Sequence, residues 1–364
     1  MLGRFERHNH DRVRAAVTLG AASAQAAARR LGIRILALFL QGTRSVVRIL
    51  GVLLSSLLVP SLAAPADDVR GWGQLVDRLT GDGIPRERVL GAFRDPRMPP
   101  FTGLTFGLAS HEPRSLYRRF LGGKSIAAAR RCRIEHAAAL EAAERAHGVP
   151  AGIVAAVLHV ETGCGRNTGR NGILYALARL AMANEPANLR TNIARHAGRR
   201  PPDATLLARV RARAEYLDDT FYPEVRATFA LAERLRVDPL DLHGSGSGAF
   251  GDAQFLPSSY LRYGIDADGN GQVDLYDFRD AAASCANYLA MNGWREAASE
   301  AQRRAVIWRY NHSPAYIETV LALARRIQEP CGRSTTVARH RSTRPTRKQR
   351  KTDPPAALAR ADVR

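Results

Sequence analysis

Residues 148–169 read GVPAGIVAAVLHVETGCGRNTG. Pro150 suits the first turn of a helix, and the apolar run Ile153–Val160 that follows predicts a helix buried in a protein core. The run ends in the carboxylate of Glu161, after which Gly163 and two further glycines interrupt the helix. A negative charge at this place lies beside apolar neighbours and near the partly negative carbonyl end of the helix.

The rest of the chain after Ala66 also shows a helical pattern of apolar residues. Apolar residues recur with helical spacing and no run of alternating β-branched residues stands out, so the predicted fold class is mainly α. Short β elements or loops are expected around residues 240–275, and the polar, Arg-rich stretch 185–215 is expected to form a surface excursion or an extra helical hairpin. The expected helices cover residues 126–146, 150–161, 173–182, 224–235, 280–291 and 314–327.

The ends of the chain hold most of its excess positive charge. Of the net charge of +20, residues 1–48 contribute +7 and residues 333–364 contribute +8. The apolar segment 49–66 ends in small residues before Asp67, which is typical of a signal peptide with its cleavage site. Residues 1–66 are therefore expected to direct export to the periplasm. A start site near Val46, an uncleaved anchor within residues 33–59 and a buried N-terminal helix are the alternatives.

The predicted folded domain covers residues 67–331, and the basic tail 332–364 lacks apolar periodicity. Such a tail is expected to be disordered and to contact anionic envelope polymers or a membrane surface. Charge alone would also allow nucleic acid, but an exported chain rarely meets it, so no nucleic-acid partner is predicted. A monomer is expected.

Four cysteines are present: Cys132, Cys164, Cys285 and Cys331. In an exported protein they can form disulfides, and four cysteines allow three connectivities. Their spacing matches no zinc motif, so no metal is assigned to them. Small unpaired core residues are the alternative for at least two.

Glu161 is the candidate catalytic group. An apolar environment raises the pKa of a carboxyl group, which favours a proton donor usable near neutral pH. Cleavage of a glycosidic bond needs such a donor, because the leaving oxygen must be protonated. The alternative is a structural glutamate that hydrogen-bonds the backbone or Arg166.

A glycine-rich stretch, GSGSGAFGDAQFLPSSY, covers residues 244–260. Its small residues let the backbone approach a ligand closely. Gln254 offers a donor and an acceptor suited to sugar hydroxyl or acetamido groups. By itself, such a run of Gly and Ser is more often an ordinary loop.

The stretch DADGNGQVDLYD, residues 266–277, matches a twelve-residue calcium loop. The last position is aspartate, whose shorter side chain favours a weaker site or another hard cation such as Na⁺. The alternative is a turn held by Asx hydrogen bonds. No cofactor is expected for the chemistry, and the ion would be structural. The predicted ligands are Asp266, Asp268, Asn270, Gln272 and Asp277.

Together and in this order, these stretches resemble the membrane-bound lytic murein transglycosylase B family, which has a lysozyme-like domain. The resemblance extends from Val69 to Ile327. Besides the three stretches above, it rests on LYRRFL (116–121), ILYALARLA (173–181), FYPEVRATFALA (221–232), CANYLAMNGW (285–294) and RYNHSPAYIETV (309–320).

The resemblance implies cleavage of the β-1,4 bond between N-acetylmuramic acid and N-acetylglucosamine in peptidoglycan. The muramyl C6 hydroxyl would attack C1 and leave a 1,6-anhydro end, with Glu161 as the single acid and base. It also implies that substrate is bound by Tyr117, Ser245, Gln254, Tyr288, Tyr310, Asn311 and Tyr316.

The carboxylate pattern agrees with this mechanism, because a standard glycosidase needs two carboxylates. The next acid after Glu161 is Glu185, and only Asp252 lies in the glycine-rich stretch.

Three features depart from the family pattern: Asp252, Cys164 and the length of the stretch 185–215. Asp252 could act on Glu161 or shift the reaction towards hydrolysis, and Cys164 could reshape one wall of the groove. A muramidase-type hydrolase and a non-catalytic glycan-binding scaffold are the competing hypotheses.

Overall fold

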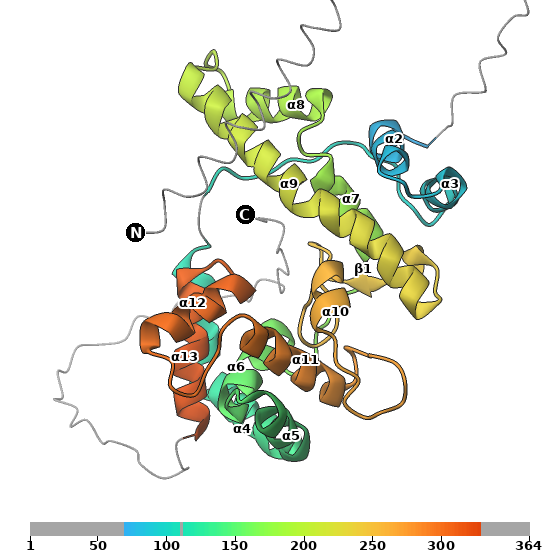
Figure 1. Ribbon diagram of the computed structural model, residues 1–364. Coiled ribbons are helices and arrows are strands. Elements are labelled where there is room, and N and C mark those ends of the chain that lie inside the picture. Colours follow the sequence, from blue (N-terminus) through green and yellow to red (C-terminus); the bar gives the residue numbers. More distant parts are fainter. Residues whose placement is uncertain (1–68, 110–111, 329–364) are drawn as a thin grey trace, which may run out of the picture. The chain divides into compact units, whose positions relative to one another are not determined.

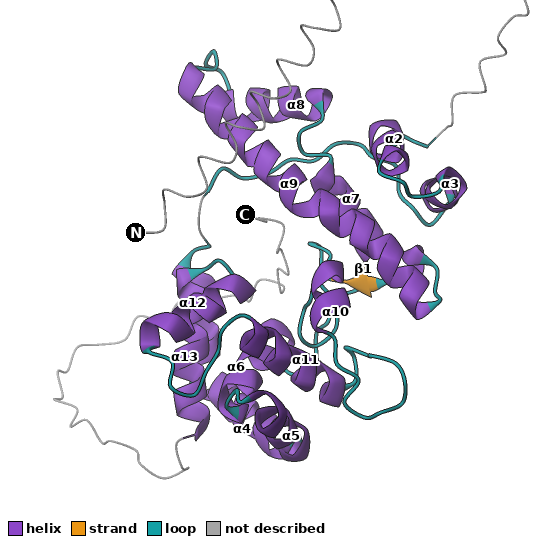
Figure 2. Ribbon diagram, viewed as in Figure 1, coloured by secondary structure: helices purple, strands orange, loops and turns teal. Residues whose placement is uncertain are grey.

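The computed structural model describes residues 69–109 and 112–328. The predicted export segment, the basic tail and Cys331 lie outside these residues. The described part is mainly helical, as predicted (Figure 2). Its helices are α2 (Gly73–Gly81), α3 (Arg86–Arg94), α4 (Gly123–Glu135), α5 (Ala137–His147), α6 (Ala151–Thr162), α7 (Ile173–Ala181), α8 (Pro186–Ala197), α9 (Ala204–Leu235), α10 (Pro257–Tyr263), α11 (Phe278–Met291), α12 (Glu300–Tyr310) and α13 (Pro314–Gln328).

Short elements connect these helices. Within the described ranges, 3₁₀ helices cover Arg114–Leu116, Arg118–Leu121 and Pro239–Asp241. Strands β1 (Asn171–Gly172) and β2 (His243–Gly244) pair antiparallel. No helix among the described residues is long and apolar enough to cross a membrane.

Helix α6 is the centre of one helical cluster and packs against α4, α5, α11 and α13 (Figure 1). Every residue of α6 except Glu161 is buried, as its apolar sequence predicts. The Glu144 carboxylate accepts a 2.9 Å hydrogen bond from the Ala151 N–H and so caps the start of the helix. The result is a fixed, dehydrated helix with one carboxylate at its end.

The predicted helix 126–146 is interrupted, which corrects the sequence-based expectation. His136 leaves helical geometry with φ −111° and ψ 25°, and it separates α4 from α5. Its imidazole stacks on Phe278 with ring centroids 3.7 Å apart. This tertiary contact lies outside the local alanine-rich signal, so helical propensity alone could not place the break.

Helix α9 is much longer than the predicted 224–235 and includes Pro223 in its interior. It packs against α7, α8 and α10 (Figure 1). The polar stretch 185–215 forms α8 and the first part of α9. Further along α9, the buried Glu224 carboxylate accepts hydrogen bonds from the Ser258 N–H (2.9 Å) and hydroxyl (2.5 Å), and thereby fixes the start of α10.

The glycine-rich stretch lies against the segment that leaves α6. Strand pairing places Asn171 opposite Gly244. Gly169 has φ +87°, and a Cβ atom there would lie 2.1 Å from the Gly244 carbonyl oxygen. Only glycine allows this close backbone approach, which brings the glycine-rich stretch beside the end of α6.

Candidate active site

A sharp turn follows Glu161 at the end of α6. Gly163, Cys164 and Gly165 all have positive φ, at 64°, 60° and 77°. The Thr162 hydroxyl stabilises the turn, because it accepts a 2.9 Å bond from the Gly165 N–H and donates a 3.0 Å bond to the Asp252 carbonyl. Left-handed geometry is unfavourable for a non-glycine residue such as Cys164, so its side chain needs a compensating contact.

That contact is a disulfide between Cys132 of α4 and Cys164, whose Cα atoms lie 6.4 Å apart. The sequence left three pairings open, and the structure shows this one. Cys285 is buried with a free thiol. The turn after Glu161 is thus covalently attached to a neighbouring helix, and this explains what the unusual Cys164 does.

Glu161 faces a cleft of about 230 Å³. Five of the predicted site residues line it together: Glu161, Ser245, Gln254, Tyr310 and Asn311. The other lining residues are Glu112, Tyr216, Thr220, Phe221, Ser247, Ala249, Leu256 and His312. The cleft therefore collects residues from α6, α9, the glycine-rich stretch and the end of α12.

Ser245 and Gln254 shape one wall of this cleft. The Ser245 hydroxyl accepts a 3.1 Å hydrogen bond from the Ala249 N–H. The Gln254 side-chain amide donates to the carbonyls of Thr168 (3.1 Å) and Gly251 (2.9 Å). Gln254 thus joins the segment after α6 to the glycine-rich stretch, while its side chain still borders the cleft.

The four predicted tyrosines form one aromatic cluster. Ring centroids are 6.0 Å apart for Tyr117 and Tyr316, 6.5 Å for Tyr310 and Tyr316, and 4.9 Å for Tyr288 and Tyr310. Only Tyr310 of these four lines the cleft. Tyr316 is fully buried and Tyr117 is 6% exposed, so the cluster supports the cleft from behind. Their predicted contact with substrate stays a prediction.

The charge of Glu161 affects the pKa values of two tyrosines in this cluster. Burial is the main cause that raises the pKa of Tyr316 well above its ordinary value, and the Glu161 charge adds to it. The pKa of the Tyr310 hydroxyl is raised in the same way, first by burial and then by Cys285, Tyr316 and Glu161. Both hydroxyl groups therefore remain protonated near neutral pH, next to the candidate catalytic carboxylate.

Asp252 does not line the cleft. Its carboxylate lies against Gly165, where an added Cβ atom would be 2.7 Å from an Asp252 oxygen. Its backbone N–H donates a 2.7 Å bond to the Leu275 carbonyl. Burial raises its pKa to about 7, with further contributions from the charges of Asp274 and Asp277. Asp252 thus connects the turn after Glu161 with the predicted ion loop.

The ion loop groups its carboxylates differently from the prediction. Oxygen atoms of Asp266, Asp268 and Asp280 lie within 4.8 Å of one another. Asp277 lies outside this group and caps α11, while Arg279 pairs with both Asp277 (2.8 Å) and Asp268 (2.7 Å). Carboxylates are the ligands that hard cations prefer, so Asp280 is a candidate ligand that the twelve-residue pattern could not indicate.

The other two predicted ligands, Asn270 and Gln272, lie on the exposed part of this loop. The Asn270 amide nitrogen donates a 3.0 Å hydrogen bond to Asp268, and its amide oxygen accepts a 2.8 Å bond from the Gln272 N–H. These contacts hold the tip of the loop together, next to the three clustered carboxylates.

Glu112 is a lining residue that the sequence gave no reason to select. It carries the second carboxylate of the described cleft lining, beside Glu161. The Tyr117 hydroxyl donates a hydrogen bond to it. Glu112 lies in a connecting segment without helical periodicity, so its spacing from Tyr117 gave no signal.

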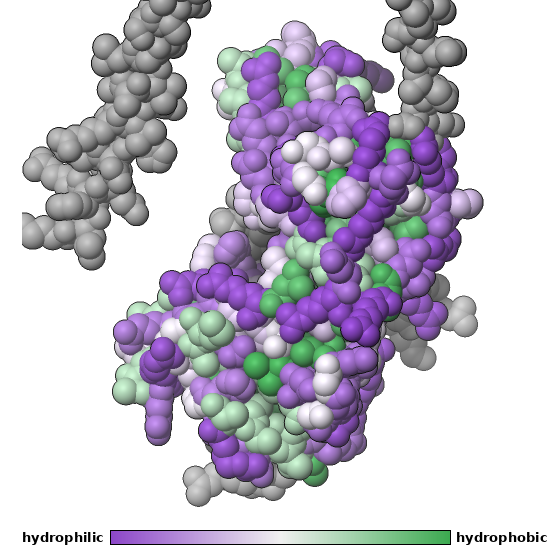
Figure 3. Space-filling view, turned by 45° about the vertical axis from the view of Figure 1, so that its right-hand side comes forward, coloured by the Kyte–Doolittle hydropathy of each residue, from purple (hydrophilic) through white to green (hydrophobic). Residues whose placement is uncertain are grey.

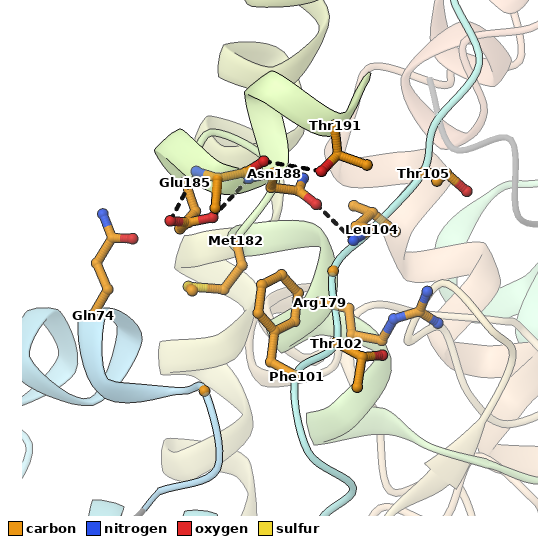
Figure 4. Close-up of a pocket in the computed structure, with 13 residues that line it drawn as sticks. Gln74, Phe101, Thr102, Leu104, Thr105, Arg179, Met182, Glu185, Asn188 and Thr191 are labelled. Carbon is orange, nitrogen blue, oxygen red and sulfur yellow. Dashed lines mark hydrogen bonds between the residues drawn. The ribbon is translucent and has the colours of Figure 1, made fainter. Parts of the chain in front are cut away.

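A larger cavity of about 550 Å³ lies elsewhere, between α2, residues 101–105, α7 and α8 (Figure 4). Its polar groups have structural tasks. The Glu185 carboxylate caps α8 by accepting from the Ala187 and Asn188 N–H groups, and the Asn188 amide oxygen accepts from the Leu104 N–H. None of the predicted catalytic residues lines it, so the cleft at Glu161 is the candidate active site.

A further cavity of about 540 Å³, lined mainly by alanines of α5, contains none of the predicted site residues. Polar side chains dominate the face in Figure 3, with smaller apolar areas between them. The exposed large apolar side chains among the described residues include Leu116, Ile134, Met291 and Trp308, which are distributed over several helices. Single exposed apolar residues are normal on soluble proteins.

Comparison with known proteins decides the family. Residues 74–304 match the family model of the transglycosylase SLT domain. The chain belongs to this family. Over 156 residues it is 36% identical to the membrane-bound lytic murein transglycosylase B of Escherichia coli, a match that covers 43% of this chain and 35% of that protein. The matched part is thus about a third of the length of the relative.

Solved structures of family members share the fold. The lytic transglycosylase SLT35 of Escherichia coli in complex with bulgecin A has a TM-score of 0.53 at 23% identity, over 70% of this chain and 92% of that one. The soluble lytic transglycosylase SltB1 of Pseudomonas aeruginosa has a TM-score of 0.52 at 25% identity, over 70% of this chain and 97% of that one. The lysozyme-like transglycosylase fold expected from the sequence is therefore present.

Proposed function

We propose that the protein is a peptidoglycan lytic transglycosylase that forms 1,6-anhydromuramyl ends. The observation that carries this proposal is Glu161, the single non-buried residue of α6, which faces a cleft in a member of this family. Glu161 would protonate the glycosidic oxygen between N-acetylmuramic acid and N-acetylglucosamine as the bond breaks. Its carboxylate would then take the proton of the muramyl C6 hydroxyl as that oxygen bonds to C1.

The other cleft residues would bind and orient the glycan. Ser245, Gln254 and Asn311 present polar groups around Glu161, suited to hydroxyl and acetamido groups. Tyr310 borders the same space, and Tyr288 and Tyr316 pack against its ring from behind. Tyr117 packs in turn on Tyr316. A fixed arrangement of this kind favours the intramolecular attack, because the reacting groups need little further ordering.

Relatives support this class of substrate. SltB3 of Pseudomonas aeruginosa has been solved in complex with NAG-anhNAM-pentapeptide and with NAG-NAM-pentapeptide. The first of these ligands contains the anhydro sugar that the proposed reaction forms. For the present chain we infer the same glycan backbone as substrate.

Product analysis tests the proposal. Sacculi digested with wild-type protein should release muropeptides with anhydromuramyl ends, which mass spectrometry separates from reducing ends by the mass of one water. Glu161→Gln should abolish release, because the amide cannot donate the proton. Glu141→Gln is a matched control, since Glu141 is exposed on α5 away from the cleft. Release that persists in Glu161→Gln would show that another group carries the chemistry, whereas a wild-type protein that releases nothing would support a non-catalytic role of the chain.

A muramidase is the second candidate function, and Glu112 is the observation that favours it. A hydrolase on this fold needs a second carboxylate near the bond, and Glu112 borders the same cleft as Glu161. Reducing muramyl ends in the wild-type digest would establish hydrolysis and overturn the transglycosylase proposal.

We infer that the loop at residues 266–280 binds a structural Ca²⁺ or another hard cation. The three clustered carboxylates Asp266, Asp268 and Asp280 support this inference. SLT35 of Escherichia coli has been solved in complex with calcium. The ion would stabilise the loop next to Asp252 and would take no part in the proton transfers at Glu161.

We further propose that the domain 67–331 acts in the periplasm after export through residues 1–66. The Cys132–Cys164 disulfide supports this proposal, because structural disulfides persist in oxidising compartments. Protease protection of the protein in intact cells, compared with cells whose outer membrane has been permeabilised, tests it. Protein recovered in the cytosolic fraction with both thiols free would contradict it.

A further inference from the structure

Two carboxylates, Glu112 and Glu161, border the cleft within its described lining. Glu161 terminates α6, whereas Glu112 precedes the 3₁₀ helix Arg114–Leu116. The proposed one-carboxylate mechanism gives Glu112 no task. Its position beside the reacting groups therefore requires a separate explanation.

Tyr117 is the immediate partner of Glu112. Its hydroxyl donates a hydrogen bond to the Glu112 carboxylate. The pKa of Tyr117 is raised first by burial, then by the hydrogen bond and charge of Glu112, and then by the charge of Glu161. The phenol therefore stays protonated and acts as the donor, with Glu112 as the acceptor.

Tyr117 also contacts Tyr316 of the aromatic cluster behind the cleft. Its ring meets the edge of Tyr316 at 6.0 Å and 85°, and the Tyr316 N–H donates a 3.3 Å hydrogen bond to the Ser313 hydroxyl. Ser313 is fully buried, and its N–H donates a 2.7 Å bond to the carbonyl of Asn311. Asn311 lines the cleft, so a continuous set of contacts runs from Glu112 to Asn311.

We propose that Glu112 is a positioning residue that acts through Tyr117. Its carboxylate fixes the Tyr117 hydroxyl, and Tyr117, through its contact with Tyr316, supports the turn 311–313 that presents Asn311 to the glycan. Glu112 has no role as the base that activates water. This inference rests on the proposed function, because the residues it positions are those proposed to bind peptidoglycan.

A double-mutant cycle tests the proposal. The variants are Glu112→Ala, Tyr117→Phe and the double variant, with Glu141→Gln as the control. Loss of a hydrogen bond to a charged group changes kcat/KM by roughly 10- to 100-fold, and we expect such a loss in each single variant. Since both remove the same contact, the double variant should be no worse than the weaker single one. If the double variant instead loses kcat/KM by the product of the two single losses, the proposal is overturned.

The conservative variant Glu112→Gln separates positioning from chemistry. The glutamine oxygen still accepts the Tyr117 proton, so kcat should remain within about threefold of the wild-type value, since the contact survives as a neutral hydrogen bond. The fraction of anhydro ends should be unchanged. Activity as low as in Glu112→Ala, or a loss confined to reducing ends, would identify Glu112 as a catalytic base and overturn the proposal.

Failure of the proposed transglycosylase activity can be distinguished from failure of the proposed positioning by Glu112. Wild-type protein that releases no muropeptide would refute the transglycosylase activity while leaving the contact testable. The same cycle is then measured as the affinity for N-acetylglucosamine tetramer by calorimetry, with melting temperatures recorded for every variant. Coupled losses of affinity at unchanged melting temperature support positioning. Independent losses, or no loss in any variant, contradict it.

Discussion

The Tyr310 hydroxyl donates a 2.6 Å hydrogen bond to the backbone carbonyl of Ala253, the residue that precedes Gln254. This bond joins the end of α12 to the glycine-rich stretch and so fixes two walls of the cleft relative to each other. Ala253 is fully buried, and its carbonyl loses this partner when the hydroxyl is removed.

Tyr310→Phe should therefore lower both stability and turnover. Loss of this bond costs about 1–2 kcal/mol in the free energy of unfolding, which urea denaturation measures. We expect kcat to fall more than KM changes, because the walls of the cleft lose their fixed spacing. Tyr175→Phe is the control, since Tyr175 makes ring contacts and its hydroxyl forms no hydrogen bond with another described residue. Equal turnover in the two variants would contradict the interpretation.

Removal of the disulfide should destabilise the domain and weaken catalysis. The bond closes a loop with a sequence separation of 32, so the double variant Cys132→Ser/Cys164→Ser should lose roughly 3–4 kcal/mol of stability. Release of the turn after Glu161 should also reduce kcat. Dithiothreitol should reproduce both effects in Cys285→Ala, which retains this disulfide. An unchanged melting temperature after reduction would exclude a structural role for the bond.

Calcium should raise the melting temperature in proportion to the logarithm of its concentration above the Kd. Asp280→Asn should abolish this increase, whereas Asp277→Asn should retain most of it, because Asp280 lies with Asp266 and Asp268 while Asp277 pairs with Arg279. Differential scanning calorimetry with calcium or with EDTA makes the comparison. Loss of the shift in Asp277→Asn alone would restore the ligand set predicted from the sequence.

Asp252 should make stability depend on pH in a defined direction. Its pKa rises from 3.8 in the ordinary case to about 7 in the fold, so the folded state binds more protons than the unfolded state between these values. Stability should fall as the pH rises from about 4 to about 7, by up to about 4 kcal/mol for this group. Asp252→Asn should remove this component in calcium-free buffer. If the difference in the free energy of unfolding between the wild type and Asp252→Asn stays constant with pH, the prediction is contradicted.

The fold was largely predictable because its decisive signals are local. The apolar run before Glu161 and the glycines after it predicted the buried helix α6 and its end. The resemblance to a family supplied the candidate cleft residues, and five of them meet in space. Periodicity could not reveal the break at His136, because the stacking partner Phe278 lies far away in sequence.

The parts of the site that the sequence did not predict depend on contacts that sequence spacing does not encode. The calcium-loop pattern ends at position twelve and so selected Asp277, whereas the first turn of α11 directs Asp280 towards the other carboxylates. Glu112 reaches the cleft through a connecting segment without helical periodicity. The pairing of Cys132 with Cys164 needed the packing of α4 beside α6.

The covalent attachment of Cys164 also bears on how the protein must be prepared. Recombinant chains made in a reducing cytosol would carry two thiols at these positions, and the segment that follows Glu161 would lose its covalent link to α4. Assays on such material would therefore measure a lower kcat and a lower stability than those of the oxidised protein. Oxidative refolding, or expression with secretion, should therefore precede any measurement of specific activity, with a thiol titration to confirm that the cross-link has formed.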